Sequence, residues 1–259
     1  MTSRPPSLFL SHGSPMHALE PGAVGKVWEG LAAGLPRPKA ILMASAHWEA
    51  EVPMFTGAAK PETIHDFYGF PAPLYRIQYP APGAPDLASR ARQLLKDAGI
   101  AAGIDGARGL DHGAWSPLLH MYPDADIPVV QVSVQTACGP RINYDIGRAL
   151  APLADEGVLL FGSGHMTHNL RDRANGPTAA YVLEFQEWVD ARLRNGETDR
   201  LLDYRAQAPH AVRAHPTDEH FLPLFFAMGA AKAGARPERL YGAVETGALA
   251  MDAYLFASA

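Results

Sequence analysis

The chain has 259 residues, of which 47% are hydrophobic and 19% are charged, and its formal net charge is -5. A chain of this length and composition is expected to fold as an ordinary globular protein whose core needs no disulfide, and not as a disordered or fibrous one. No block of Lys and Arg stands out, so we do not expect the basic face that a nucleic-acid partner would need.

Apolar runs and amphipathic stretches alternate along the chain. Four short apolar runs that end at small residues or turn signals are predicted to be buried strands, at 8–10, 40–44, 127–134 and 158–161. Four stretches have the spacing of amphipathic helices, at 86–98, 141–154, 178–193 and 217–228. The proline-rich stretch 71–85 is expected to be a long ordered loop. This alternation predicts a single α/β domain over residues 1–259, with a mostly parallel central sheet flanked by helices on both faces.

The cysteine content and the N-terminal residues indicate the cytoplasm. Cys138 is the only cysteine, which excludes an intrachain disulfide and fits a reducing compartment. Because it lies in a turn-like stretch, 136–140, we expect its thiol to have no chemical role. The first six residues lack the apolar core of a signal peptide, and no apolar run approaches the roughly 20 residues that span a bilayer. We therefore expect a cytoplasmic protein with no membrane partner.

Eleven histidines are many for this length, and several follow predicted strands. His12 and His47 follow two of the strands, and His165 and His168 follow a third. In open α/β sheets, ligands bind beyond the carboxyl ends of the strands, so these side chains are expected at the functional edge. A mononuclear catalytic site needs about three protein ligands, and imidazole-rich sites suit Zn, Fe, Cu or Ni. A metal site explains this placement better than a chance set of hydrogen-bonded loop histidines does.

A further ligand is expected at the start of the last predicted helix. Glu219 and His220 are adjacent there, so on a helix they point about 100° apart, and both are not expected to reach one ion. The residues alone do not choose between them.

Two segments combine polar and aromatic side chains in a way that suits a site. In the segment 110–117, His112 stands between an acid and a glycine, and Trp115 follows. Residues 64–71 contain His65, an aspartate and three aromatics, among them Tyr68, and either line an aromatic pocket or cap the core. Aromatic residues around Tyr68 and Tyr75 also leave open a homo-oligomer.

Six motifs follow one another in the chain, at 11–15, 45–48, 65–71, 111–115, 162–170 and 215–224. Together they resemble the DODA-type, class III (LigB-like) extradiol aromatic ring-opening dioxygenases, from about residue 7 to residue 250. Each motif alone is weak, but six in the same order with natural spacing are specific.

This resemblance implies a non-haem Fe(II) centre that opens the ring of a catechol with O₂, with Zn(II) as the other candidate ion. The substrate would be a DOPA-like or related dihydroxy aromatic. Carried over by position, His12, His47 and His220 would be the metal ligands. The wider class uses a Glu at the third position, so this site would be richer in imidazole. His168 would be an acid or base, or a fourth ligand. His112 would contact the substrate or support the site, and either His168 or His112 would act as the catalytic acid in ring cleavage.

From the two polar and aromatic segments, His65, Tyr68 and Trp115 are expected to bind the substrate. His165 receives no role.

Two other functions compete with the dioxygenase. A zinc hydrolase would use the same histidines to activate a water molecule. A metal-storage or binding protein is less favoured, because storage needs neither the aromatic loop nor the additional His112 and His168. The histidines outside these motifs, His17, His120 and His210 especially, are expected to be surface or packing residues.

Overall fold

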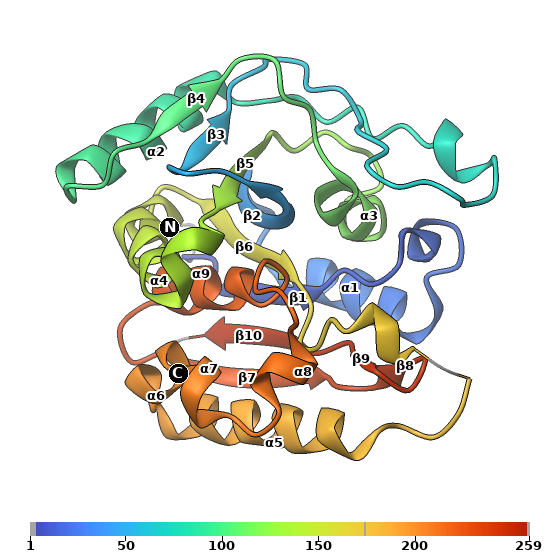
Figure 1. Ribbon diagram of the computed structural model, residues 1–259. Coiled ribbons are helices and arrows are strands. Elements are labelled where there is room, and N and C mark those ends of the chain that lie inside the picture. Colours follow the sequence, from blue (N-terminus) through green and yellow to red (C-terminus); the bar gives the residue numbers. More distant parts are fainter. Residues whose placement is uncertain (1–3, 174, 258–259) are drawn as a thin grey trace.

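The structure is a computed structural model that describes residues 4–173 and 175–257, so both ends of the predicted domain, 1–259, extend past the described part. Its centre is an eight-stranded sheet in the order β4-β3-β5-β2-β6-β1-β10-β7, and β8 and β9 form a separate ribbon (Figure 1). The strands are β1 (Ser7–Ser11), β2 (Ala40–Glu49), β3 (Met54–Thr56), β4 (Gly103–Asp105), β5 (Val129–Val134), β6 (Val158–Gly164), β7 (Arg236–Tyr241), β8 (Val244–Glu245), β9 (Leu249–Ala250) and β10 (Ala253–Ala257).

The centre of the sheet is parallel, as predicted. β1 pairs with β6, β6 with β2, and β2 with β5, all in parallel. These are the four strands expected from the apolar runs. Both sides of this centre contain antiparallel pairs that were not predicted: β10 runs antiparallel to β1 and to β7, and β3 runs antiparallel to β5.

Helices and short turns connect the strands. The α-helices are α1 (Gly22–Gly34), α2 (Pro85–Asp97), α3 (His112–Met121), α4 (Gly139–Leu150), α5 (Ala180–Asn195), α6 (Thr198–Leu202), α7 (Tyr204–Gln207), α8 (Ala211–Ala214) and α9 (Leu222–Ala230). The 3-10 turns are η1 (Pro15–Ala18), η2 (Leu74–Arg76), η3 (Thr136–Cys138), η4 (Ala151–Ala154) and η5 (Leu170–Asp172). In the described part of the chain, no helix is both long enough and apolar enough to cross a membrane.

One helix prediction needs correction. The last helix begins at Leu222 and not at Thr217, with Pro223 in its first turn, where the missing amide of proline causes no loss. The segment 112–121 forms helix α3, which was not predicted. The Asp111 side chain caps α3 by accepting a hydrogen bond from the backbone amide of Ala114.

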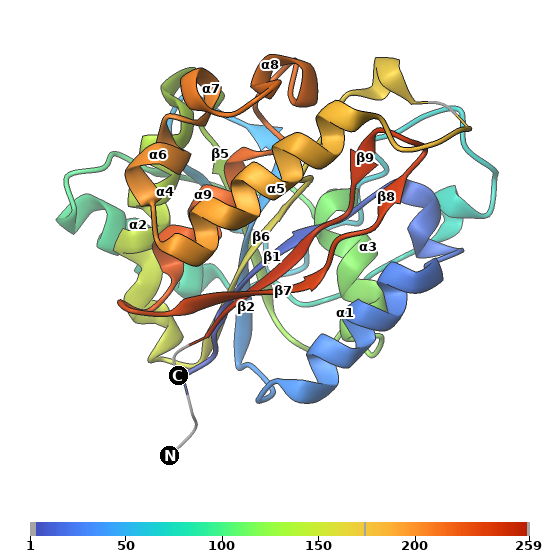
Figure 2. The ribbon, with the colours of Figure 1, turned by 90° about the horizontal axis from the view of Figure 1, so that it is seen from below.

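Helices cover both faces of the sheet, as predicted. In both views α1 and α3 lie on one side of the sheet, and α4 and α9 lie on the other (Figures 1 and 2). Along β1, Phe9 belongs to the core that includes α4 and α9, while Leu8 and Leu10 belong to the core that includes α1 and α3. Because both faces are buried, the strand is apolar at successive positions.

The segment that carries His220 packs directly against the end of β6. A Cβ atom at Gly164 would lie 2.2 Å from the carbonyl oxygen of His220, and one at Gly162 would lie 2.1 Å from that of Pro223. The backbone amide of His165 donates to the carbonyl oxygen of His220 at 2.7 Å. The two glycines therefore bring His220 to the edge where β1, β2 and β6 end.

Candidate active site

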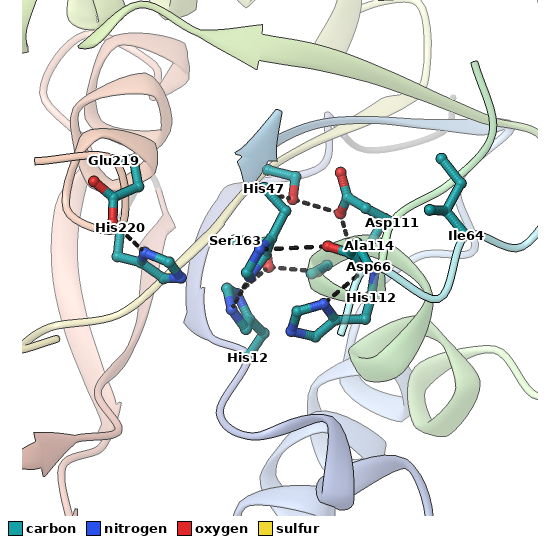
Figure 3. A network of polar contacts seen from close by, with 12 residues as sticks. His12, His47, Ile64, Asp66, Asp111, His112, Ala114, Ser163, Glu219 and His220 are labelled. Atoms are coloured by element: carbon teal, nitrogen blue, oxygen red, sulfur yellow. Dashed lines mark hydrogen bonds and ion pairs between the residues drawn. The ribbon is translucent and has the colours of Figure 1, made fainter. Parts of the chain in front are cut away.

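Three histidine rings converge at the carboxyl ends of the parallel strands (Figure 3). His12 directly follows β1, His47 lies near the end of β2, and His220 lies just before α9. One ring nitrogen of each lies within 4.8 Å of the others. The Nε2 atoms of His12 and His47 are 3.0 Å apart. The structure therefore brings together the three residues that were predicted as metal ligands.

Protein oxygens hold the Nδ1 atoms of His12 and His220. Nδ1 of His12 lies 3.0 Å from Oγ of Ser163, and that hydroxyl donates to the carbonyl oxygen of Gly113 at 2.5 Å. Ser163 must therefore accept the proton of His12 Nδ1. Nδ1 of His220 donates to the carboxylate of Glu219 at 3.0 Å. A neutral imidazole that is protonated at Nδ1 carries its lone pair on Nε2, as histidines that bind metals commonly do.

Asp66 orients two further rings. Its Oδ2 atom lies 3.4 Å from Nδ1 of His47, and its Oδ1 atom accepts hydrogen bonds from Nδ1 and from the backbone amide of His112 at 3.0 and 2.9 Å. Burial raises the pKa of Asp66, but the hydrogen bonds and charge of His112 outweigh burial and lower the pKa to about 2. Asp66 therefore stays ionised and keeps a proton on the Nδ1 atom of each ring.

The convergent nitrogens suit a metal ion. Nε2 of His220 is buried and has no hydrogen-bond partner among the described residues. Burial, reinforced by the neighbouring histidines, holds the pKa values of His12 and His220 well below their usual range. Burial also lowers the pKa of His47 to about 3. All three rings are therefore neutral at neutral pH, and a buried lone pair without a proton donor fits a transition-metal ion.

The three rings face a cavity of about 450 Å³. Phe67, Tyr68 and Phe70 give this cavity an aromatic wall, and Leu170 and Leu249 add apolar surface. Tyr68 is 90% exposed, so it stands at the mouth of the cavity. A cavity of this size and lining accommodates one aromatic ring with a short substituent.

His168 lies beside the three-histidine cluster. Its ring stacks on that of His220, with centroids 3.5 Å apart and planes inclined by 14°. It forms a second group with Glu219 and His220, in which the candidate ligand atoms also lie within 4.8 Å of one another. Burial, followed by the charges of His47 and Arg173, lowers the pKa of His168 to about 3. A neutral His168 on the wall of the cavity can accept a proton.

The residues that were predicted to bind substrate occupy different places. Tyr68 lines the cavity, but His65 and Trp115 are not part of its lining. Trp115 is fully buried and donates from Nε1 to the carbonyl oxygen of Ile64 at 2.8 Å. The rings of His65 and Trp115 lie 5.8 and 6.2 Å from that of Phe67. Both residues therefore support the aromatic wall from behind.

A buried polar network behind His47 was not predicted. Asp111 accepts hydrogen bonds from Ser45 at 2.6 Å and from Gln131 at 2.7 Å. Arg108 lies 3.2 Å from Asp111 and also donates to the carbonyl oxygen of His47 at 3.2 Å. Burial raises the pKa of Asp111, and these contacts oppose that effect. Gln131, a polar residue inside the apolar run 127–134, is the sequence signal that could have revealed the network.

Ser163 was also missed, although a small polar residue between two glycines at a strand end is a recognisable signal. His165, which received no role, is buried and lines the cavity, and its Nδ1 atom has no hydrogen-bond partner in the described part of the chain.

His17 is buried, and it links two loops of the site. Its Nε2 atom lies 3.0 Å from the carboxylate of Glu245, on β8, and its Nδ1 atom lies 2.9 Å from the carbonyl oxygen of Ser14. The loop that follows His12 is thereby tied to the β8–β9 ribbon. As expected, His120 is a packing residue, with Nε2 2.8 Å from the carbonyl oxygen of His17, and His210 is a surface residue beside the carboxylate of Glu184.

Comparison with known proteins agrees with this geometry. Residues 6–250 match the family described as the catalytic LigB subunit of aromatic ring-opening dioxygenase. The chain belongs to the LigB family. It is similar to the 4,5-DOPA dioxygenase extradiol of Beta vulgaris, with 42% identity over 97% of this chain and 96% of that protein. The protein of the same name from Escherichia coli K12 is 42% identical over 88% of this chain and 86% of its own length.

A solved structure shows the same fold. The crystal structure of an uncharacterized protein from Escherichia coli K12 superposes with a TM-score of 0.83 at 36% identity, over 98% of this chain and 100% of that one. The predicted family and fold class are thus confirmed, and the chain is a metal-dependent extradiol dioxygenase that opens the ring of a catechol. The LigB assignment argues against the hydrolase and the storage protein.

Proposed function

We propose that this LigB enzyme uses Fe(II), held by His12, His47 and His220, to open the ring of a DOPA-like catechol. One observation carries the proposal: three histidine rings, two buried and one half-buried, converge, and each Nδ1 atom faces an oxygen, that of Ser163, Glu219 or Asp66. The names of the relatives from Beta vulgaris and Escherichia coli support the substrate class. Zn(II) would fit the same nitrogens and is the competing occupant.

An iron ion in this place would supply Lewis acidity toward the catechol oxygens and the redox capacity that O₂ chemistry requires. The protein fixes the ligand geometry. Because Ser163, Glu219 and Asp66 engage the Nδ1 side of each ring, the rings cannot rotate without losing a buried polar contact. The lone pairs of the Nε2 atoms therefore stay directed at one point.

Proton transfer is assigned to His168 and His112. His168 is neutral, with a pKa near 3, and lines the cavity beside His220, so it can accept the proton that a catechol loses on binding. We assign it as the base and not as a fourth ligand, because its group contains Glu219 and not His12 or His47. His112 lines the same cavity, and the Asp66 carboxylate that accepts from its Nδ1 atom fixes its ring there for the proposed proton transfer to the substrate.

The aromatic wall is assigned to substrate packing and to the exclusion of water. Phe67, Tyr68 and Phe70 would contact the catechol ring, with Tyr68 at the mouth. His65 and Trp115 are proposed to act through Phe67, since they touch its ring and not the cavity.

We further propose that residues 1–259 form one catalytic domain that works in the cytoplasm, where the exposed, free thiol of Cys138 would stay reduced. Its partners would be an aromatic diol and O₂, with no nucleic acid or membrane surface involved.

Anaerobic loading with Fe(II) or Zn(II), followed by addition of DOPA and O₂, tests the function. We expect the Fe(II) form to consume O₂ and to produce a yellow ring-opened product, and the Zn(II) form to stay inactive. Activity with Zn(II) alone would contradict the assignment of iron. Cleavage of an ester or amide without O₂, and no opening of a catechol, would contradict the dioxygenase.

A further inference from the structure

The wall of the active-site cavity contains one positively charged side chain among the described residues, that of Arg173. The carboxylate in the same wall, Asp66, is already engaged by His47 and His112. Arg173 is therefore the one cationic side chain in the described lining that a substrate entering this cavity can meet.

The chain just before Arg173 is fixed in place. The amide nitrogen of the Asn169 side chain donates to the carbonyl oxygen of Arg213 at 2.8 Å, and the side-chain oxygen of Asn169 accepts from the backbone amide of Arg171 at 3.1 Å. Asp172 forms an ion pair with Arg213 at 2.8 Å. The neighbouring carboxylate is thus occupied by Arg213, and Arg173 has no ion pair within residues 4–173 and 175–257.

Arg173 lies in the same cavity wall as His168, the ring that stacks on His220. The side chain of Arg173 is itself exposed, so it lies where the cavity opens to solvent, as the exposed Tyr68 does. A catechol whose hydroxyls point at the histidines would direct its ring substituent toward this opening.

We propose that Arg173 binds an anionic group on the ring substituent, so that the enzyme selects catechols that carry a carboxylate. The inference rests on the proposed function and adds a specificity determinant to it. A guanidinium pairs with a carboxylate through two parallel hydrogen bonds, and it repels an ammonium group. Catechols with an acidic side chain are therefore preferred to neutral catechols, and catecholamines without a carboxylate are disfavoured.

The experiment compares kcat/KM for three catechols: 3,4-dihydroxyphenylacetate, 4-methylcatechol and dopamine. The Fe(II)-loaded wild type, Arg173→Gln, Arg173→Lys and Arg171→Gln are assayed with each. Arg171 is the matched control, because it is an exposed arginine on the same segment that does not line the cavity. The readout is the ratio of kcat/KM for the carboxylate substrate to that for 4-methylcatechol.

We expect Arg173→Gln to lower this ratio by about tenfold or more, mainly through KM, because a charge-assisted hydrogen bond is lost. Arg173→Lys should restore part of the ratio, and Arg171→Gln should keep the wild-type value. The ratio of dopamine to 4-methylcatechol should rise in Arg173→Gln. Added salt should lower the carboxylate ratio of the wild type more than that of Arg173→Gln.

Equal ratios in Arg173→Gln and Arg171→Gln would overturn the inference and leave the proposed function standing, provided that the wild type opens 4-methylcatechol. If the Fe(II)-loaded wild type opened neither DOPA nor any of the three catechols, the proposed function would fail, and the inference would fail with it.

Discussion

The Nε2 atoms of His12 and His47 lie 3.0 Å apart in a buried site where both rings are neutral. Their Nδ1 protons are directed at Ser163 and Asp66, so two lone pairs face each other. Two nitrogens that each lie about 2.1 Å from one metal ion are roughly 3.0 Å apart when the angle at the ion is near 90°. The spacing is therefore that of two neighbouring ligands of one ion.

The assignment of His168 as a base predicts different effects for two stacked histidines. His168→Ala should keep the Fe(II) content of the wild type and lower kcat by about 100-fold or more, because a base is lost but no ligand. His220→Ala should lose the metal. Elemental analysis of the two anaerobically loaded variants, with kcat measured on the same samples, checks this. Loss of iron from His168→Ala would identify His168 as a ligand.

The contact between Ser163 and His12 predicts an effect on metal affinity at a residue that does not bind the ion. Ser163→Ala removes the acceptor of the His12 Nδ1 proton, so the affinity for Fe(II) should fall about ten- to hundredfold. Ser116 is a suitable control, since its buried hydroxyl has no hydrogen-bond partner among the described residues. Anaerobic metal titration of Ser163→Ala and Ser116→Ala measures the difference. Equal affinities would show that the Ser163 contact has no such role.

The close contact between Gly164 and the backbone of His220 predicts that a larger residue at position 164 displaces this third ligand. A methyl group there would lie 2.2 Å from the carbonyl oxygen of His220, so Gly164→Ala should push the His220 segment off β6. We expect a loss of about 1–3 kcal/mol in the free energy of unfolding, together with weaker metal binding. At Gly106 an added Cβ would meet nothing within 4 Å, which makes Gly106→Ala the control. Urea unfolding and metal titration of both variants measure these effects. Equal stability and equal metal affinity in Gly164→Ala and Gly106→Ala would contradict the steric role of Gly164.

The ion pair between His17 and Glu245 predicts a pH dependence. Burial lowers the pKa of His17, but the hydrogen bond and charge of Glu245 outweigh burial and raise it above the usual value. The folded state therefore gains stability that is fully present below about pH 6.5 and is lost as the pH rises through the raised pKa. In metal-free protein, the stability difference between wild type and Glu245→Gln should be larger at pH 6 than at pH 9.

Urea unfolding at the two pH values measures that difference. Glu184→Gln, which removes the exposed partner of His210, is the control and should show a smaller dependence on pH, because solvent screens an exposed pair. If the stability difference between wild type and Glu245→Gln stayed constant or grew toward pH 9, the role of the His17–Glu245 pair would be contradicted.

The position of the site could be predicted because the central strands are buried on both faces. Such strands are continuous apolar runs, and their ends are visible in the sequence, so His12, His47 and His165 could be assigned to one edge. The outer strands β7 and β3 are short or half-exposed, and their sequences carry no comparable signal. Helix α3 was hidden because Gly113 and Pro117 disfavour helices, while its cap at Asp111 and its packing stabilise it.

The choice between Glu219 and His220 could not be made from the residues, because both positions belong to a turn and not to a helix. In the structure the two side chains act together, with the carboxylate of Glu219 holding Nδ1 of His220. The roles of Ser163 and Asp66 depend on contacts between residues far apart in the chain, which spacing alone does not reveal.

The most direct test of the three-histidine site is a crystal structure of the protein loaded anaerobically with Fe(II), with anomalous data collected at the iron edge. We predict a single iron peak bound to the Nε2 atoms of His12, His47 and His220, with His168 outside bonding distance. The residues His47, Asp66 and His112 form another group with ligand atoms within 4.8 Å of one another. An iron peak at that group, or no peak at the three Nε2 atoms, would contradict the account.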